Sequence, residues 1–70
     1  MPLFLADVNK SYIIIKINGN EKIKNHLESL GFSINSEIKI VQKQGKNLIV
    51  RIKNVSMGIG LEIAKYIIVK

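Results

Sequence analysis

The chain has 70 residues, with 11 Lys and Arg against 5 Asp and Glu and a formal net charge of +6. A chain this short makes one small domain with a thin core, so we expect a single domain over residues 1–70. It has no cysteine, which excludes disulfides, thiolate metal sites and cysteine nucleophiles. It also lacks a run of about 18 apolar residues and a signal peptide, so we expect a cytoplasmic protein that does not itself span a membrane.

The first expected elements are an N-terminal arm and a strand. In residues 1–9, we expect Leu3, Leu5 and Val8 to pack over one end of a barrel. Residues 12–17 follow with the period of two that is typical of a strand. This alternation places three isoleucines on one face (Ile13, Ile15 and Ile17) and a mixed set on the other (Tyr12, Ile14 and Lys16).

Residues 20–30 predict a short helix with signals at both ends. Asn20 is a good N-cap, because its side-chain oxygen can accept a free N–H of the first turn. Gly31 stands where a left-handed residue ends a helix, and Phe32 would then contact Leu27 in a Schellman motif. The spacing i, i+4, i+7 defines one apolar stripe, formed by Ile23, Leu27 and Leu30.

Four further strands and one helical turn are expected after the loop 33–36. Residues 37–43 alternate with two isoleucines inward (Ile38 and Ile40) and charged residues outward (Glu37, Lys39 and Lys43). A hairpin turn at 44–47 leads to a strand at 48–53, and Asn54 opens a turn into a short strand at 55–59. Residues 61–65 predict one helical turn and 66–69 a last strand.

This element order predicts a mainly β fold, a small SH3-like barrel of about five strands with one short α-helix inserted after the first strand. A barrel removes the exposed edges that an isolated apolar sheet would leave. The OB fold is the other barrel of this size, but it places its helix between the third and fourth strands. The position of the helix therefore favours the SH3-like barrel.

Few residues here could carry out catalysis or bind a metal. No nucleophile–base pair, phosphate-binding loop or paired carboxylates are present, so we expect no enzymatic activity. His26 is the one histidine, at the edge of the apolar helix stripe, and we interpret it as a boundary residue. Met57 has strand spacing and is interpreted as a core residue. We expect no cofactor, and at most weak binding of Fe²⁺ or another divalent transition metal.

The positive charge leaves a nucleic-acid-binding barrel of the ribosomal or KOW kind as an alternative. It would use basic residues of the two-stranded ribbon formed by residues 37–53, namely Lys39, Lys43, Lys46, Arg51 and Lys53. A reader of single strands also needs stacking aromatics among these charges. Tyr12, Tyr66, Phe4 and Phe32 do not interleave with them, so we expect no nucleic acid partner.

Several stretches in fixed order resemble the ferrous-iron-transport protein A family, FeoA. They are PLFLADV, INGNE, LESLGF, SINSEIKIV and MGIGLEIAKYIIV, and together they cover most of the chain. Asn9 and Asn35 stand where the family usually has glycine, and asparagine tolerates the left-handed conformation better than most residues do.

The resemblance implies an SH3-like barrel that works in the cytoplasm with bacterial ferrous-iron uptake. Its implied partner is FeoB, the GTP-dependent ferrous-iron permease, or the GTPase domain of FeoB; transition-metal binding is implied by the family alone. A further alternative is an accessory domain of a metal-dependent repressor, to which the family is related. We expect partner binding at the helix-to-strand loop and the glycine-rich segment, through Phe32, Ile34, Met57, Gly58, Ile59, Gly60 and Leu61.

Overall fold

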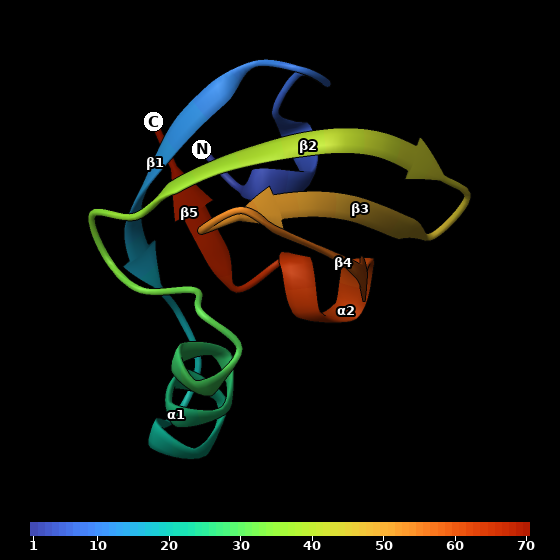
Figure 1. Ribbon diagram of the computed structural model, residues 1–70. Coiled ribbons are helices and arrows are strands. Elements are labelled where there is room, and N and C mark those ends of the chain that lie inside the picture. Colours follow the sequence, from blue (N-terminus) through green and yellow to red (C-terminus); the bar gives the residue numbers. More distant parts are fainter.

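The computed structural model describes residues 1–70 and has five strands that form one antiparallel sheet in the order β4-β3-β2-β1-β5 (Figure 1). The elements are η1 (Leu3–Leu5), β1 (Ser11–Ile17), α1 (Glu21–Ser29), β2 (Glu37–Gln44), β3 (Asn47–Ile52), β4 (Val55–Gly60), α2 (Leu61–Ala64) and β5 (Ile67–Val69). The predicted mainly β fold, with one helix after the first strand, is confirmed.

Strand β1 changes its partner along its length, and this bends the sheet. Its first half pairs with β2 in the register Ser11↔Lys39 to Ile13↔Glu37. Its second half pairs with β5, with a register shift between Ile14 and Lys16. Because such a shift inserts one residue, the side chains beyond it change face. Ile17 is therefore buried together with Ile14, and the prediction that Ile17 shares a face with Ile15 is wrong.

A second register shift moves Lys43 away from the face on which it was expected. The shift in β2 falls between Ile40 and Gln42, so Lys43 pairs with the buried Leu48. The Lys43 ammonium donates a hydrogen bond of 3.3 Å to the carbonyl oxygen of Phe4 in the N-terminal arm. Lys43 is exposed as predicted, but it does not share a face with Lys39, because strand alternation does not survive the bulge.

The core lies between the bent sheet and the N-terminal arm, and no polar or charged residue is buried in it. The arm contributes Leu3 and Ala6, both fully buried. Leu5 and Val8 are instead 61% and 39% exposed, so the prediction that they pack is wrong. Leu5 points away from Leu3 because a 3-10 turn has three residues per turn, so side chains two positions apart point in different directions; Val8 lies beyond this turn.

The predicted hydrogen bonds form at both ends of helix α1. The Asn20 side-chain oxygen accepts a 2.9 Å hydrogen bond from the Ile23 N–H. Gly31 has φ +101°, its N–H donates to the Glu28 oxygen at 2.9 Å, and the Phe32 N–H donates to the Leu27 oxygen at 3.0 Å. These two bonds define the Schellman motif, so this prediction is confirmed.

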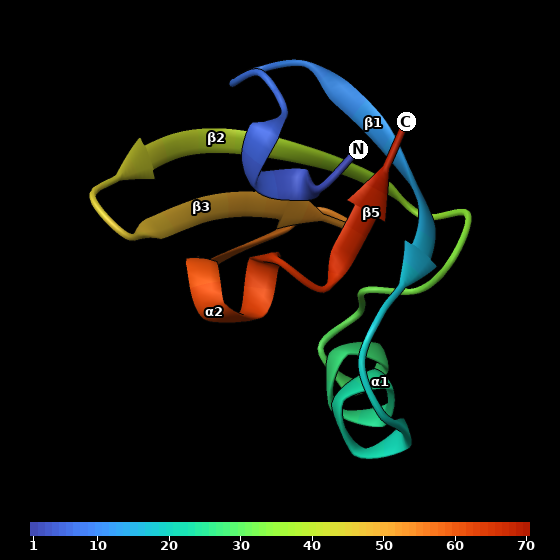
Figure 2. The same ribbon diagram turned by 180° about the vertical axis from the view of Figure 1, so that it is seen from behind.

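The apolar stripe of α1 is shorter than predicted. Leu27 and Phe32 are fully buried and Ile23 is half-buried, but Leu30 is 38% exposed. Figures 1 and 2 show the reason, because α1 projects beyond the sheet instead of lying across it. Leu30 is the C-cap residue at the end of a nine-residue helix, where the chain has already begun to turn.

Four turn residues other than glycine adopt positive φ. They include Asn9 (φ +64°) and Asn35 (φ +75°), the positions where asparagine replaces the glycine usual in the resembled family. Lys53 and Asn54 (φ +52° and +65°) form the two-residue turn between β3 and β4. Positive φ at both central residues is the mark of a type I′ turn, whose twist matches that of a hairpin.

Candidate partner-binding surface

The residues expected to bind a partner divide into buried and accessible ones. Phe32 is fully buried and Ile59 is 7% exposed, so their side chains belong to the core. Ile34 is 56% exposed and Gly58 is exposed, while Met57, Gly60 and Leu61 are half-buried. A partner can therefore reach Ile34 and the segment 57–61, but not the side chains of Phe32 or Ile59.

The loop that carries Ile34 lies beside the start of β4. The Lys53 ammonium of the β3–β4 turn donates a hydrogen bond of 3.4 Å to the Ser33 hydroxyl. Val55 follows this turn and is 54% exposed, so it adds apolar surface on this side of the molecule. The predicted partner-binding residues did not include Val55, because strand alternation places Val55 on the same face as Ile59, which is buried. The position of Val55 directly after a turn was the signal that could have indicated its exposure.

Ile34 also borders a depression of about 320 Å³ between the end of β1 and α1. The rest of the lining is mostly polar and carries both signs of charge, with Lys16, Ile17, Glu21, Lys24, Asn25 and Glu28. Ile34 is thus an apolar side chain in a polar surround. A central apolar contact with a polar rim is the common arrangement in protein–protein interfaces.

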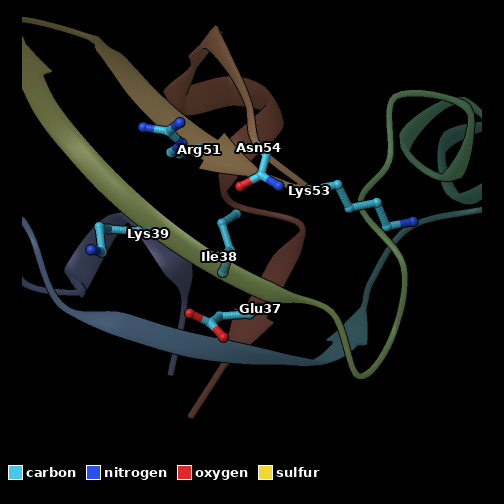
Figure 3. A pocket seen from close by; sticks show the side chains of 6 residues that line it. All are labelled: Glu37, Ile38, Lys39, Arg51, Lys53 and Asn54. Carbon is cyan, nitrogen blue, oxygen red and sulfur yellow. The ribbon is translucent and has the colours of Figure 1, made fainter.

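A second depression, of about 430 Å³, lies on the outer face of β2 and β3 (Figure 3). Its lining consists of Glu37, Ile38, Lys39, Arg51, Lys53 and Asn54, with Glu37 as the one carboxylate. Lys39 stands directly opposite Arg51 in the β2–β3 register. Like charges opposite one another destabilise a strand pair, so this surface favours an anionic neighbour.

The aromatic side chains lie away from this basic depression. Tyr12 and Phe32 are buried, and Phe4 is half-buried in the N-terminal arm. Tyr66 follows α2, where the Lys65 ammonium lies 5.2 Å from the centre of its ring. The depression therefore has no aromatic ring of the kind on which the bases of single-stranded nucleic acid stack.

The side chains present do not fit a resident metal site. No three His, Cys, Asp or Glu side chains lie close enough together to hold a metal ion. His26 is exposed on α1. A transition-metal site needs several imidazole or carboxylate ligands on one ion, and this chain does not bring such ligands together.

These features define a small β-barrel that offers surface for binding. No helix is both long and apolar enough to cross a membrane. The chain belongs to the FeoA family, because the FeoA domain model matches residues 1–70. It is therefore a protein associated with ferrous-iron transport, from a family of non-enzymatic accessory domains, as the sequence predicted.

Solved structures with this fold include FeoA proteins and a metal-dependent repressor. An iron uptake regulatory protein, FeoA, matches with a TM-score of 0.92 and 21% identity over 100% of this chain and 95% of that chain. FeoA of Stenotrophomonas maltophilia, complexed with zinc and described as a prokaryotic SH3 domain protein, has a TM-score of 0.86 and 24% identity over 100% of this chain and 89% of that chain.

A manganese-dependent transcriptional repressor matches with a TM-score of 0.85 and 16% identity over 96% of this chain and 39% of that chain. Identities this low show the fold alone, and the fold is the SH3-like barrel that was predicted. No match was found among the curated proteins.

Proposed function

We propose that this FeoA-family protein is a cytoplasmic accessory protein of ferrous-iron transport that binds the FeoB permease or its GTPase domain. The observation that carries this proposal is the match of the FeoA domain to residues 1–70. Two surface features support a protein partner, namely the exposed Ile34 and the open, glycine-containing segment 57–61. Glycine lets a partner backbone approach closely, and Ile34 offers an apolar anchor within a polar rim.

Binding to the permease GTPase domain should depend only modestly on salt if the apolar anchor supplies most of the affinity. The experiment is a titration of that domain from about 50 to 200 mM salt, with a mixed single-stranded oligonucleotide as the comparison ligand. Ile34→Asp should weaken binding of the GTPase domain, because it places a charge at the contact. Leu5→Asp is the matched control, since Leu5 is equally apolar and 61% exposed on the N-terminal arm.

The opposite pattern would support the nucleic-acid alternative. In that case the oligonucleotide would bind tightly at physiological ionic strength, and Lys39→Glu or Arg51→Glu would abolish binding through the basic depression. Ile34→Asp would then have no effect on either ligand. That set of results would contradict the proposal that this protein binds the FeoB permease.

The protein should bind ferrous iron only weakly, because His26 is exposed and no ligand cluster surrounds it. Anaerobic calorimetry with Fe²⁺ should show no stoichiometric binding at micromolar concentrations, and His26→Ala should change nothing. Tight stoichiometric binding that His26→Ala abolishes would contradict this prediction. The oligomeric state is recorded in the same experiment, since two chains could share ligands across an interface.

A further inference from the structure

The two edges of the sheet are covered to very different extents. At the β5 edge, Pro2 bridges to Ile68, the Val69 N–H donates to the Met1 oxygen at 2.7 Å, and the Met1 amino group donates to the Val69 oxygen at 2.7 Å. At the other edge, β4 pairs with β3 alone, in one unbroken register from Asn47↔Gly60 to Ile52↔Val55. The outer side of β4 has no strand beside it, so the expectation that a barrel removes the exposed edges is wrong at this edge.

The backbone groups that this open edge presents follow from the turn. A type I′ turn at Lys53–Asn54 closes with a hydrogen bond from the N–H of Val55 to the carbonyl oxygen of Ile52. In an antiparallel pair, hydrogen-bonded and non-hydrogen-bonded positions alternate. The N–H and C=O groups of Ser56 and Gly58 therefore point away from β3, and both residues are exposed.

Strand β4 lacks the features that usually protect an edge. Its sequence VSMGIG has no charged residue and no proline, and its register with β3 contains no bulge. An unprotected edge of this kind is a template for another strand. The residues on its outer face, Ser56 and Gly58, are also small, so they do not obstruct the approach of another strand.

We propose that the open edge of β4 accepts an extended acidic segment of a partner protein as an added antiparallel strand. The charge of the neighbouring surface argues for the acidic character of this segment. Ser56 continues the row of Lys39 and Arg51 across the sheet. A residue added opposite Ser56 would lie two strand spacings, about 10 Å, from Arg51, a span that an arginine and a carboxylate side chain bridge together. The short Ser56 side chain between them does not block the contact.

The next outward position of the added strand should be apolar. It lies opposite Gly58, where a Cβ atom would be 3.5 Å from the Cδ1 atom of the half-buried Ile49. An apolar side chain on the added strand would extend over Gly58 towards Ile49. Since an antiparallel strand runs against β4, the apolar residue precedes the acidic one by two positions. The expected pattern is therefore apolar, any residue, acidic.

A second copy of this chain is a poorer occupant of the edge than an acidic segment. The chain carries a net charge of +6, so two copies repel each other, and β4 has no acidic residue to place opposite Ser56. The inference goes beyond the proposed function, because it concerns how this edge holds a segment, whichever protein supplies the segment. It can hold or fail independently of permease binding.

The test uses a fluorescent, end-blocked synthetic peptide, Ser-Thr-Ile-Thr-Glu-Thr-Ser, and a matched peptide with lysine in place of glutamate. The full chain should bind the glutamate peptide about tenfold more tightly than the lysine peptide, since one charge-assisted contact to Arg51 is exchanged for a repulsion. Arg51→Glu should reverse this preference. Lys22→Glu, on the exposed start of α1, is the matched charge control and should leave the preference unchanged.

Backbone pairing is tested at Gly58. Gly58→Pro removes the outward N–H and should weaken binding about tenfold, whereas Gly58→Ala keeps the N–H and should weaken binding less, because it adds only a methyl group beside Ile49. Amide exchange of the unaltered protein gives the same information without a substitution. On addition of the glutamate peptide, the amides of Ser56 and Gly58 should become protected, while that of Val69 should be unchanged.

Three results would overturn the proposal: equal affinity for the two peptides, unchanged affinity in a folded Gly58→Pro variant, or no protection of the Ser56 and Gly58 amides at saturating peptide. Protection of these two amides in the free protein, together with a dimeric mass in sedimentation, would show instead that a second copy occupies the edge.

Discussion

The two edges of the sheet show how one kind of backbone can serve either stability or binding. Strand β5 is covered by Met1 and Pro2, and the arm that carries them is fixed by the fully buried Leu3. Strand β4 is longer, has no charged residue and is left uncovered. When an edge is covered, its backbone N–H and C=O groups form hydrogen bonds within the chain. When it is left open, these groups stay available to another chain.

The largest effect is expected at the anchor of the covered edge. Leu3→Ala should lower the free energy of unfolding by about 2–5 kcal/mol, because it leaves a cavity where a fully buried side chain was and loosens the arm over β5. Leu5→Ala is the control in the same turn and should change the free energy by about 0.5 kcal/mol or less. Urea denaturation measures both, and equal losses would mean that the arm is not anchored through Leu3.

A smaller difference is expected between two glycines that have different roles. Gly31 has φ +101°, and a Cβ atom added there would meet nothing nearer than the Ile52 side chain at 4.0 Å, so Gly31→Ala should cost about 1–2 kcal/mol through backbone strain alone. Gly58 does not have a positive φ, so Gly58→Ala should cost about 0.5 kcal/mol or less. Thermal unfolding of both variants measures this, and a larger loss at Gly58 would show that β4 needs glycine for its own fold.

The smallest expected effect is a difference in amide exchange rate between the two edges of the unaltered protein. In the free protein, the amide of Val69 should exchange slowly with deuterium because it is bonded to Met1. The amides of Ser56 and Gly58 should exchange rapidly, since no strand lies beyond β4. Amide exchange followed by NMR compares them directly. Rapid exchange at Val69 would remove the contrast between the two edges.

Much of the fold could be predicted because its signals are local. The Asn20 cap and the Gly31–Phe32 stop depend on residues a few positions apart, and the structure contains both. The order of the predicted elements indicated the barrel, and the ordered motifs then identified the family. Each of these conclusions depends on residue types at short, fixed spacing.

The errors came from features that depend on distant partners. The shifts after Ile14 and Ile40 arise where a strand meets a neighbour of different register, so alternation alone placed Ile17 and Lys43 on the wrong face. The prediction that Leu30 belongs to the buried apolar stripe was wrong because the helix projects beyond the sheet. The open edge of β4 could not be predicted from the sequence either, since it depends on which strands lie beside β4 in space and not on the residues of β4 itself.

The measurement that tests the account most directly is NMR mapping of the labelled protein with the GTPase domain of the permease. The account predicts saturable shifts at Ile34, at residues 57–61 and at the α1 residues that form the polar rim around Ile34, with little change at Val69. The same titration with Ile34→Asp should require more partner for the same shifts. No shift at saturating partner, or shifts confined to Lys39, Arg51 and Lys53, would contradict the account.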